Sequence, residues 1–173
     1  MDLIVSHTIG TICAKKYFSK RNFGGGSLML WGAFKADGTV ALVVLGKRLK
    51  SEDYQEVLND NLLPIWNSDF KFLQNNASIH VSKSSKAWFR KNKIELIDHP
   101  PVPPDLNPME NLWGIIVRSV YKDGRQYKTV NELSRAVFKA WDEIPQSLLQ
   151  KLAMTMPDRI FEVISKHGNP ISY

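Results

Sequence analysis

The 173-residue sequence predicts an α/β domain, and three observations support this prediction. A hydrophobic fraction of 43%, with five tryptophans and eight phenylalanines, indicates an ordinary globular core. Short apolar runs bounded by turn residues, typical of strands, dominate the first half, whereas apolar residues at helical spacing dominate the second. No repeat, low-complexity segment or linker divides the sequence, so we expect one domain over residues 1–173.

Four segments have the pattern of strands. Two neighbouring strands are expected at 27–34 (SLMLWGAF) and 39–46 (TVALVVLG), because the Asp37-Gly38 pair between them is a strong hairpin signal. Apolar residues alternate in FKFLQ at 70–74, which predicts a third strand. The short apolar run IELI at 94–97 predicts a further buried strand.

Two helices are expected between these strands. The first begins with Ser51 as its N-cap and carries apolar residues at helical spacing, namely Tyr54, Val57, Leu58, Leu62 and Ile65. The second covers residues 82–92, with Trp88 expected to anchor it in the core.

Helices dominate the rest of the chain. After a proline-rich loop at 99–108, Asn107 is expected to cap a helix with Pro108 at its first position and a buried stripe of Trp113, Ile116, Val117 and Val120. Thr129 and Glu132 form a capping box for the next helix, which would bury Leu133, Val137 and Trp141. Short helices are also expected near 145–153 and 157–167. This order of elements suits a ribonuclease H-like mixed sheet flanked by helices.

Composition restricts the partners and the compartment. The net charge of +6 and the pI near 9.4 favour polyanions, of which nucleic acid is the commonest. A single cysteine, Cys13, excludes an intramolecular disulfide and a cysteine-clustered metal site, which fits the cytosol or the nucleus. The longest apolar run, at 40–46, is too short to span a bilayer, and the N-terminus has no charged region typical of a secretory signal. We therefore expect no membrane partner.

Four sequence blocks resemble the catalytic domain of Tc/mariner transposases, and especially the Tc-type elements of nematodes: KRNFGGGSLMLWGAF, FLQNNASIHVS, PPDLNPMENLWGIIVRSVY and DRIFEVISKHGNPISY. The resemblance covers the chain from about Phe18 to Tyr173 and implies a ribonuclease H-like fold. It also implies an ancestral enzyme that cuts and rejoins DNA with Mg²⁺ ions held by two aspartates and a glutamate. Phosphodiester cleavage by two metal ions needs several carboxylates around them.

The resemblance maps two of these acidic positions onto the chain. Asn75 occupies the position of the second catalytic aspartate, and Glu110, after the family's interval of 34 residues, occupies that of the glutamate. Asn75 brings no negative charge. Glu110 is left with two roles, a weak metal ligand or the closing residue of a capping box with Asn107. His80 matches a family histidine, for which we expect a structural role.

The first aspartate has no clear counterpart. We expect the first strand of the domain to be partly or wholly missing, because few residues precede Arg21. Asp2 could begin a substitute strand, but its surroundings do not match the family motif, so we expect a terminal polar residue. The family's N-terminal helix-turn-helix units are also expected to be absent. Because two of the three metal-binding acids have no acidic counterpart here, we expect no cofactor.

A basic stripe is expected on the helix at 82–92. Lys83, Lys86, Arg90 and Lys93 follow one another at spacings of three, four and three, which places them on one face. This stripe could track nucleic-acid phosphates, or it could be a solvated surface. A second basic group at 15–23, with interleaved aromatic residues, could stack on bases.

Two functions remain open at this point. The first is a transposase-derived, domesticated protein without nuclease activity, acting in the nucleus, or alternatively the cytoplasm, as a protein-interaction scaffold or as a nucleic-acid-binding factor without sequence preference. The second is a metal-dependent transposase or strand-transferase, with DNA integration activity retained through Glu110 and replacement acids such as Asp98 or Asp105. An unselected relic of a transposon is a third interpretation. Because family members assemble as dimers or larger complexes, the resemblance also raises the expectation of a homodimer.

Overall fold

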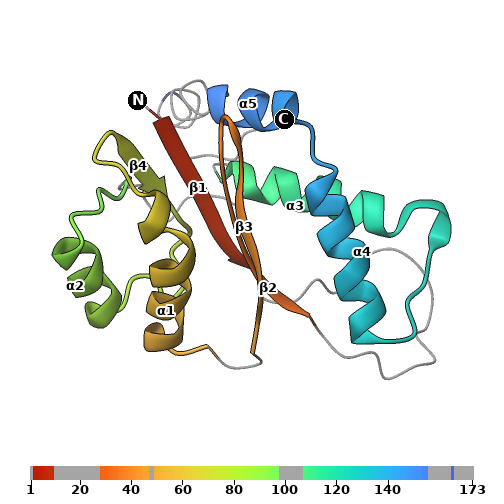
Figure 1. Cartoon of the computed structure of the whole chain (residues 1–173), viewed down its shortest axis with the longest axis horizontal. Coiled ribbons are helices and arrows are strands. Elements are labelled where there is room, and N and C mark those ends of the chain that lie inside the picture. Colours follow the sequence, from red (N-terminus) through yellow and green to blue (C-terminus); the bar gives the residue numbers. More distant parts are fainter. Residues whose placement is uncertain (1, 10–27, 47–48, 98–106, 156–164, 166–173) are drawn as a thin grey trace.

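A four-stranded mixed sheet forms the centre of the protein (Figure 1). The computed structural model describes residues 2–9, 28–46, 49–97, 107–155 and 165. The strands are β1 (Asp2–Ile9), β2 (Met29–Lys35), β3 (Gly38–Leu45) and β4 (Phe70–Leu73), in the spatial order β3-β2-β1-β4. β2 runs antiparallel to both β1 and β3, whereas β4 runs parallel to β1.

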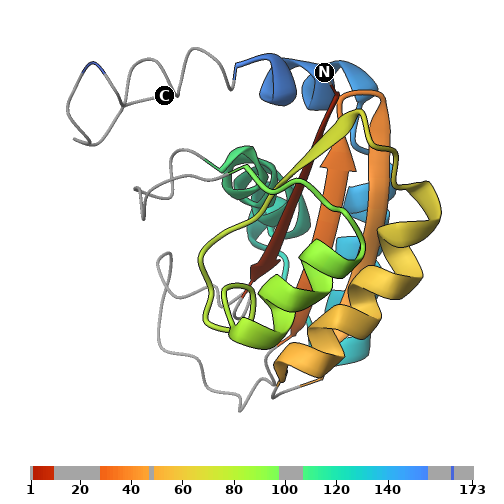
Figure 2. The same cartoon turned by 90° about the vertical axis from the view of Figure 1, so that its left-hand side faces the viewer.

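Helices cover both faces of this sheet. α1 (Ser51–Asn61) and α2 (Lys83–Lys91) lie on one side of it, and α3 (Pro108–Val120) and α4 (Val130–Asp142) lie on the other (Figure 2). α5 (Gln146–Met154) crosses one end of the sheet on the α3 side and packs against β2 and β3. Within the described residues, no helix has the length and apolar content needed to cross a membrane.

The alternation of side chains along β2 explains why the domain has two cores. Leu30 and Phe34 pack among the residues of α3, α4 and α5, whereas Trp31 and Ala33 pack among those of α1 and α2. Successive side chains of a strand point to opposite faces, so one apolar strand fills both layers. The run LWGAF is buried at every position for this reason. The α/β class and the ribonuclease H-like sheet predicted from the sequence are confirmed.

Most of the local predictions agree with the structure. The hairpin turns at Ala36-Asp37, one residue earlier than expected, with Lys35 paired to Gly38 and Lys35 Nζ 2.7 Å from Asp37 Oδ2. Asn107 caps α3, and Thr129 Oγ1 accepts a hydrogen bond from the Glu132 amide at the start of α4. The segment 94–97 pairs with β4 through one parallel bridge, between Phe72 and Leu96. The helix expected at 157–167 lies outside the described residues except for Ser165.

Two expectations about α1 are wrong. Lys50 is the N-cap of this helix and Ser51 is its first residue; the Lys50 amide donates to Asp53 Oδ2 at 2.8 Å. Ile65 was expected on the buried stripe but is exposed, because α1 ends at Asn61 and a short 3-10 turn containing Pro64 follows. Proline cannot continue the hydrogen-bonding pattern of an α-helix.

The core anchor of α2 also differs from the expectation. Phe89 and Ser85 are its buried residues, while Trp88 is only half-buried and faces α1. Phe89 stacks near Phe72 of β4, with ring centroids 5.8 Å apart. Trp88 and Phe89 are neighbours in the helix and lie about 100° apart around its axis, so only one of them can point into the core. That residue is Phe89, although Trp88 has the larger ring.

The first strand is present. β1 occupies the central position between β2 and β4, with Asp2 paired to Phe70 at one end and Ile9 paired to Leu30 at the other. This strand was expected to be partly or wholly missing, and the structure has an eight-residue strand at this position. Its apolar and β-branched residues DLIVSHTI suit an extended chain with a neighbour on each side, and eight residues suffice for it.

Candidate functional site

The backbone after β4 carries Asn75 towards the face of the sheet covered by α3. Leu73 belongs to the core on the α3 side, whereas Gln74 accepts a hydrogen bond from the Tyr54 hydroxyl of α1 at 2.5 Å. Alternation along an extended chain then returns position 75 to the side of Leu73. Asn75 is half-buried there, and its Oδ1 accepts a long bond from the Ala77 amide at 3.4 Å.

His80 fixes the turn that follows Asn75. This side chain is 1% exposed, and its Nδ1 lies 3.1 Å from the main-chain oxygen of Asn75. The imidazole also stacks on the Tyr54 ring, with centroids 4.3 Å apart. His80 therefore connects the backbone of residue 75 to the layer of α1, which is the structural role expected from the sequence.

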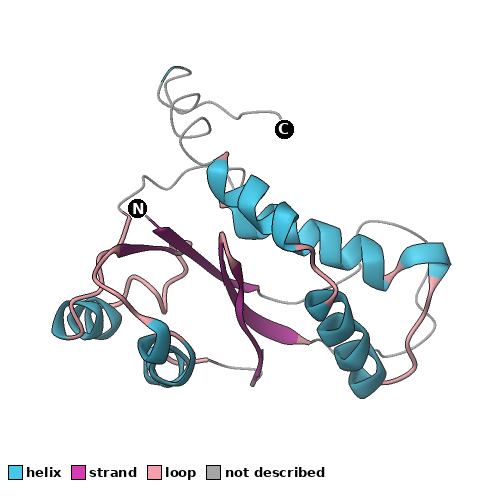
Figure 3. Cartoon of the chain, turned by 45° about the horizontal axis from the view of Figure 1, so that its top comes forward, coloured by secondary structure: helices cyan, strands magenta, loops and turns pink. Residues whose placement is uncertain are grey.

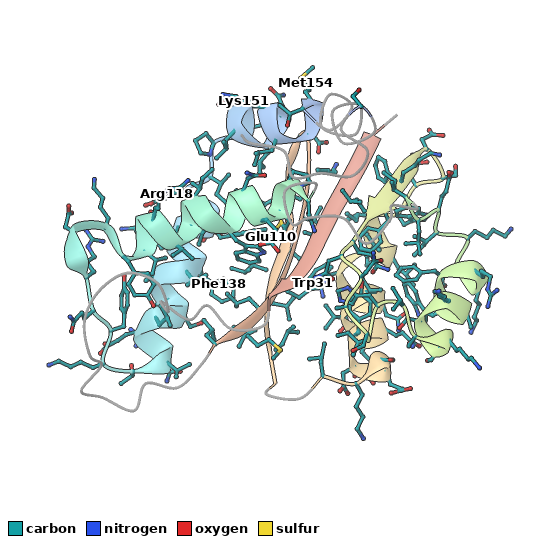
Figure 4. The ribbon with its side chains drawn as sticks, turned by 180° about the vertical axis from the view of Figure 1, so that it is seen from behind. Trp31, Glu110, Arg118, Phe138, Lys151 and Met154 are labelled. Carbon is teal, nitrogen blue, oxygen red and sulfur yellow. The ribbon has the colours of Figure 1, made fainter. Side chains whose placement is uncertain are left out.

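The first turn of α3 holds Glu110. Asn107 Oδ1 accepts from the Met109 amide at 3.0 Å, and Pro108 occupies the first helical position, where no amide hydrogen is needed. The cap bond therefore goes to the second residue of the helix, and Glu110 places its half-buried side chain in the same turn. Figure 4 shows Glu110 on the end of α3 that lies beside β1, with which α3 is in contact.

Glycine at position 32 allows α3 to approach this closely. A Cβ atom built on Gly32 would lie 2.9 Å from Met109 Cε and 3.0 Å from Trp113 Cζ2. Such distances are shorter than ordinary van der Waals contact, so any other residue would displace the helix or its side chains. The close crossing fixes the height of Glu110 over the sheet, since Met109 precedes it directly.

Strand pairing places Asn75 and Glu110 at the same level of the sheet. Gly32, which lies under Met109, pairs with His7 of β1. Val5 pairs with Leu73, the last residue of β4, and Asn75 follows two residues later, on the side of β1 where His7 pairs with Gly32. Asn75 and Glu110, the two positions that the family resemblance assigns to acids, therefore lie towards the same end of β1.

No second carboxylate accompanies Glu110 at this level in the part of the chain that the structure describes. Asp2 pairs with Phe70, five residues before Asn75, and a rise of about 3.3 Å per residue separates the two levels by about 16 Å. Asp98 and Asp105 lie outside the described residues. Among those described, no three His, Cys, Asp or Glu side chains form a group that could hold a metal ion.

These residues do not fit a two-metal centre. Mg²⁺ prefers several oxygen ligands, and pairs of catalytic metal ions need several carboxylates to balance their charge. The described part of this site supplies the Glu110 carboxylate and the neutral Asn75 amide. We therefore derive no reaction step through a bound metal ion.

The basic stripe lies on the other face of the sheet. Lys83, Lys86 and Arg90 are exposed on α2, and Lys93 is exposed two residues beyond the end of that helix, with a φ of 54°. α2 packs on the core that contains α1, whereas α3 packs on the opposite core. The predicted nucleic-acid contacts therefore lie on the opposite face of the sheet from α3, the helix that carries Glu110, and Figure 3 shows helices on both sides of the sheet.

A set of acidic residues beside the stripe was missed in the sequence. Glu52, Glu56 and Asp60 are all exposed on α1, the helix next to α2. Their spacing of four residues was a readable signal, because residues four apart lie on the same side of a helix.

Comparison with known proteins supports the family resemblance and the fold. The sequence profile of the DDE superfamily endonucleases matches residues 13–134. The Tc3 transposase of a Caenorhabditis elegans transposable element is 45% identical over 160 residues, which cover 90% of this chain and 49% of the relative. The Tcb2 transposase of Caenorhabditis briggsae is 33% identical over 154 residues, covering 87% and 56%. The chain spans about half the length of these curated relatives.

Solved structures share the same architecture. The catalytic domain of Mos1 mariner transposase superposes with a TM-score of 0.73 at 14% identity, covering 99% of this chain and 83% of that one. A pre-cleavage Mos1 transpososome gives a TM-score of 0.78 at the same identity, covering 98% and 57%. Other Mos1 catalytic-domain structures contain Raltegravir with Mg or Mn. The fold is therefore that of these ribonuclease H-like domains, and the chain belongs to the Tc1/mariner-type transposases of the DDE superfamily, of which it contains the catalytic-domain region.

Proposed function

We propose that this chain is a transposase-derived protein that lacks nuclease activity and acts as a protein-interaction scaffold. One observation carries the proposal: the level of the sheet where α3, β1 and β4 meet provides a single described carboxylate, that of Glu110. The packing around it is intact, from the Asn107 cap to the contact of Met109 with Gly32. A domain that retains its fold without its metal ligands is suited to binding rather than to cleavage.

The charges around the basic stripe favour a protein over a nucleic acid as the partner. A polyanion that follows α2 would also approach the acidic side chains of neighbouring α1. Like charges at such an approach lower affinity, particularly at low salt, where screening is weak. A protein partner can instead present both signs of charge. Nucleic-acid binding without sequence preference is the second candidate, favoured by the net charge of +6.

The single cysteine, Cys13, suits a reducing compartment. A nuclear protein, or alternatively a cytoplasmic one, would keep the single cysteine reduced. We propose the nucleus, where the ancestral transposase would meet its DNA. Imaging of the full-length tagged chain tests this directly, and exclusion from the nucleus would contradict it.

A plasmid-nicking assay tests the loss of activity. We expect the purified chain to leave supercoiled DNA intact in Mg²⁺ and in Mn²⁺. Asn75→Asp alone should not rescue cleavage, because β1 still offers no acid at the level of residue 75. Metal-dependent nicking by the unmodified chain that disappears in Glu110→Ala would show that the alternative, an active strand-transferase, is correct.

A salt titration separates the two binding candidates. If the stripe tracks phosphates, the logarithm of the affinity for duplex DNA should fall with the logarithm of the salt concentration by about 0.9 per phosphate neutralised. Replacing Lys83, Lys86, Arg90 and Lys93 with Gln would then flatten the slope by about three to four units. For a protein scaffold we expect the fourfold variant to bind duplex DNA and single-stranded RNA as the parent does.

A further inference from the structure

The two edges of the sheet differ in how their main-chain groups are bonded. At the β4 edge, the Phe72 amide donates to the Glu95 carbonyl at 2.8 Å, and the Ile97 amide donates to the Phe72 carbonyl at 2.9 Å. At the other edge, β3 pairs with β2, and no further hydrogen bond reaches β3 from the described ranges. Alternate residues of an edge strand direct their amide and carbonyl groups outwards, so this row of β3 is open to a partner.

The sequence of β3, GTVALVVL, lacks the charged residues and prolines that commonly protect an edge strand. Its irregularity lies beside the hairpin turn, where the ladder with β2 skips Val40. Beyond that bulge, the run from Ala41 to Leu45 pairs regularly with β2. A run of this length is close to the mean strand of about five or six residues, so it can pair with one more strand.

The face of this edge on the α3 side is apolar. Val44 pairs with Leu30, a residue of the core that contains α3, and Val44 itself is 46% exposed. Leu42 packs against the same core. Side chains opposite one another on neighbouring strands are in contact, and apolar and β-branched pairs are favourable there. A strand added beside β3 would therefore place apolar side chains against Val44.

The orientation of α1 determines what lies over the other face. Gln55 Nε2 donates to Ser84 Oγ at 2.6 Å, and Trp88 Nε1 donates to Asn59 Oδ1 at 3.2 Å, so Gln55 and Asn59 lie on the side of α1 that faces α2. α1 contacts β3, and Figure 2 shows α1 in front of β3 with α2 farther from this edge. The side of α1 opposite to α2 therefore faces the β3 edge.

That side of α1 is acidic. With 3.6 residues per turn, Asp53, Val57 and Asp60 lie on the opposite side of the helix from Gln55 and Asn59. Val57 packs against the core that α1 shares with β3, whereas Asp53 and Asp60 are exposed. The two carboxylates thus give the edge a negative charge on the α1 face.

We propose that β3 accepts an extended segment of a partner protein as an additional strand, an inference that rests on the proposed scaffold function and names the chemistry of its partner. The segment alternates apolar side chains, which lie against Val44, with basic side chains, which lie on the face of Asp53 and Asp60. Main-chain hydrogen bonds give affinity in this mode of binding, and alternate side chains give specificity. A phosphodiester backbone does not match the edge, since it offers acceptors without amide donors.

A short synthetic peptide of alternating lysine and valine, blocked at both ends, is the probe. Calorimetric titration of the full chain should show one peptide bound per chain. The same peptide with every amide nitrogen methylated keeps its side chains but has no main-chain donors, so it should not bind. A peptide of alternating glutamate and valine should bind at least about tenfold more weakly, because it places like charges beside Asp53 and Asp60. Equal binding of the methylated or the glutamate peptide would overturn the proposal.

Amide hydrogen exchange locates the bound peptide. At saturation, exchange should slow at least about tenfold at alternate amides of Ala41–Leu45, because the remaining ones are already bonded to β2. The Phe72 amide, at the opposite edge, should be unchanged. Binding without slower exchange in β3 would show that the peptide lies elsewhere and would overturn the proposal.

A matched pair of variants tests the apolar face. Val44→Lys should weaken binding of the lysine–valine peptide by about fivefold, because a like charge replaces an apolar cross-strand contact. Val81→Lys makes the same change at an exposed valine close to α2 and should leave binding unchanged. If Val44→Lys does not fold by circular dichroism, Val44→Thr replaces it, with a smaller loss of affinity. Equal affinities of the folded Val44 variant and the parent would contradict the proposal.

Two further outcomes separate this inference from its alternatives. Self-association of the chain that the peptide disrupts would assign the edge to a second copy and overturn the proposal. In a chain that does not cleave DNA, absence of peptide binding would overturn the proposal and leave the scaffold function to another surface. DNA cleavage by the parent would overturn the proposed function instead and leave the peptide results unchanged.

Discussion

The crossing of α3 over the sheet and the acidic positions beside it lie at one level of the molecule, yet they differ in what has been kept. At the crossing, Gly32 accommodates Met109 and Trp113 at distances that leave no space for a side chain. Beside it lie Asn75 and Glu110, the positions that the family resemblance assigns to two acids, and only Glu110 is a carboxylate. The close packing at the crossing is therefore intact, whereas on this assignment one of the two acidic positions is neutral.

This difference shows that fold and catalysis depend on separate residues of the same elements. The helix that carries Glu110 is held by Asn107, Met109 and Trp113, none of which needs a metal ion. Replacing an aspartate by asparagine preserves the size of the side chain and removes its charge. The fold should therefore tolerate changes at positions 75 and 110, and the loss of stability on substitution should be larger at the α3 crossing than at these two positions.

Removal of Trp113 should have the largest effect. This side chain is 2% exposed and stacks near Trp141, with ring centroids 5.9 Å apart. Truncation of a buried aromatic ring costs about 3–5 kcal/mol, so Trp113→Ala should lower the free energy of unfolding by that amount in urea denaturation. Trp88→Ala, at a half-buried ring on the other face, should cost clearly less. Equal losses at the two tryptophans would contradict the importance given to the α3 crossing.

Gly32→Ala should have an intermediate effect. The added methyl group would press on the flexible end of Met109 and on the rigid ring of Trp113, and overpacking of this kind costs about 1–3 kcal/mol. Gly46→Ala is the matched control, because no atom lies within 4 Å of the Cβ position there. A destabilisation of the control as large as that of Gly32→Ala would mean that the close approach is not the cause.

Restoring the acid at position 75 should have a smaller effect and should not stabilise the protein. Without metal, a carboxylate at this level would repel Glu110, so Asn75→Asp should be neutral or should lower the free energy of unfolding by about 0.5–2 kcal/mol in EDTA. Asn76→Asp, at an exposed neighbour, serves as the control. A higher melting temperature for Asn75→Asp in EDTA would argue against like-charge repulsion at this site.

The sequence predicted the sheet and its helices well, because local signals agreed with the global fold. The hairpin between β2 and β3 and the caps at Asn107 and Thr129 are encoded by a few neighbouring residues. The choice between Trp88 and Phe89 depended instead on the direction of the neighbouring layer, which helical spacing does not specify.

The candidate site was predicted only in part. The family motif located Asn75 and Glu110, but their common level follows from strand pairing and from the contact of Gly32 with α3. The presence of β1 was missed because strands are stabilised by distant partners rather than by local signals. The two hydrogen bonds that join α1 to α2, Gln55–Ser84 and Trp88–Asn59, likewise connect residues far apart in the sequence and became visible only in the structure.

The number of Mn²⁺ ions bound per chain tests the central claim most directly, that one described carboxylate is left where two metal ions would need several. Equilibrium dialysis or paramagnetic resonance of the unmodified chain should detect no pair of bound ions, and any single weak site should disappear in Glu110→Ala. Two Mn²⁺ ions bound per chain, both lost in Glu110→Ala, would contradict the claim and show that the chain supplies other ligands.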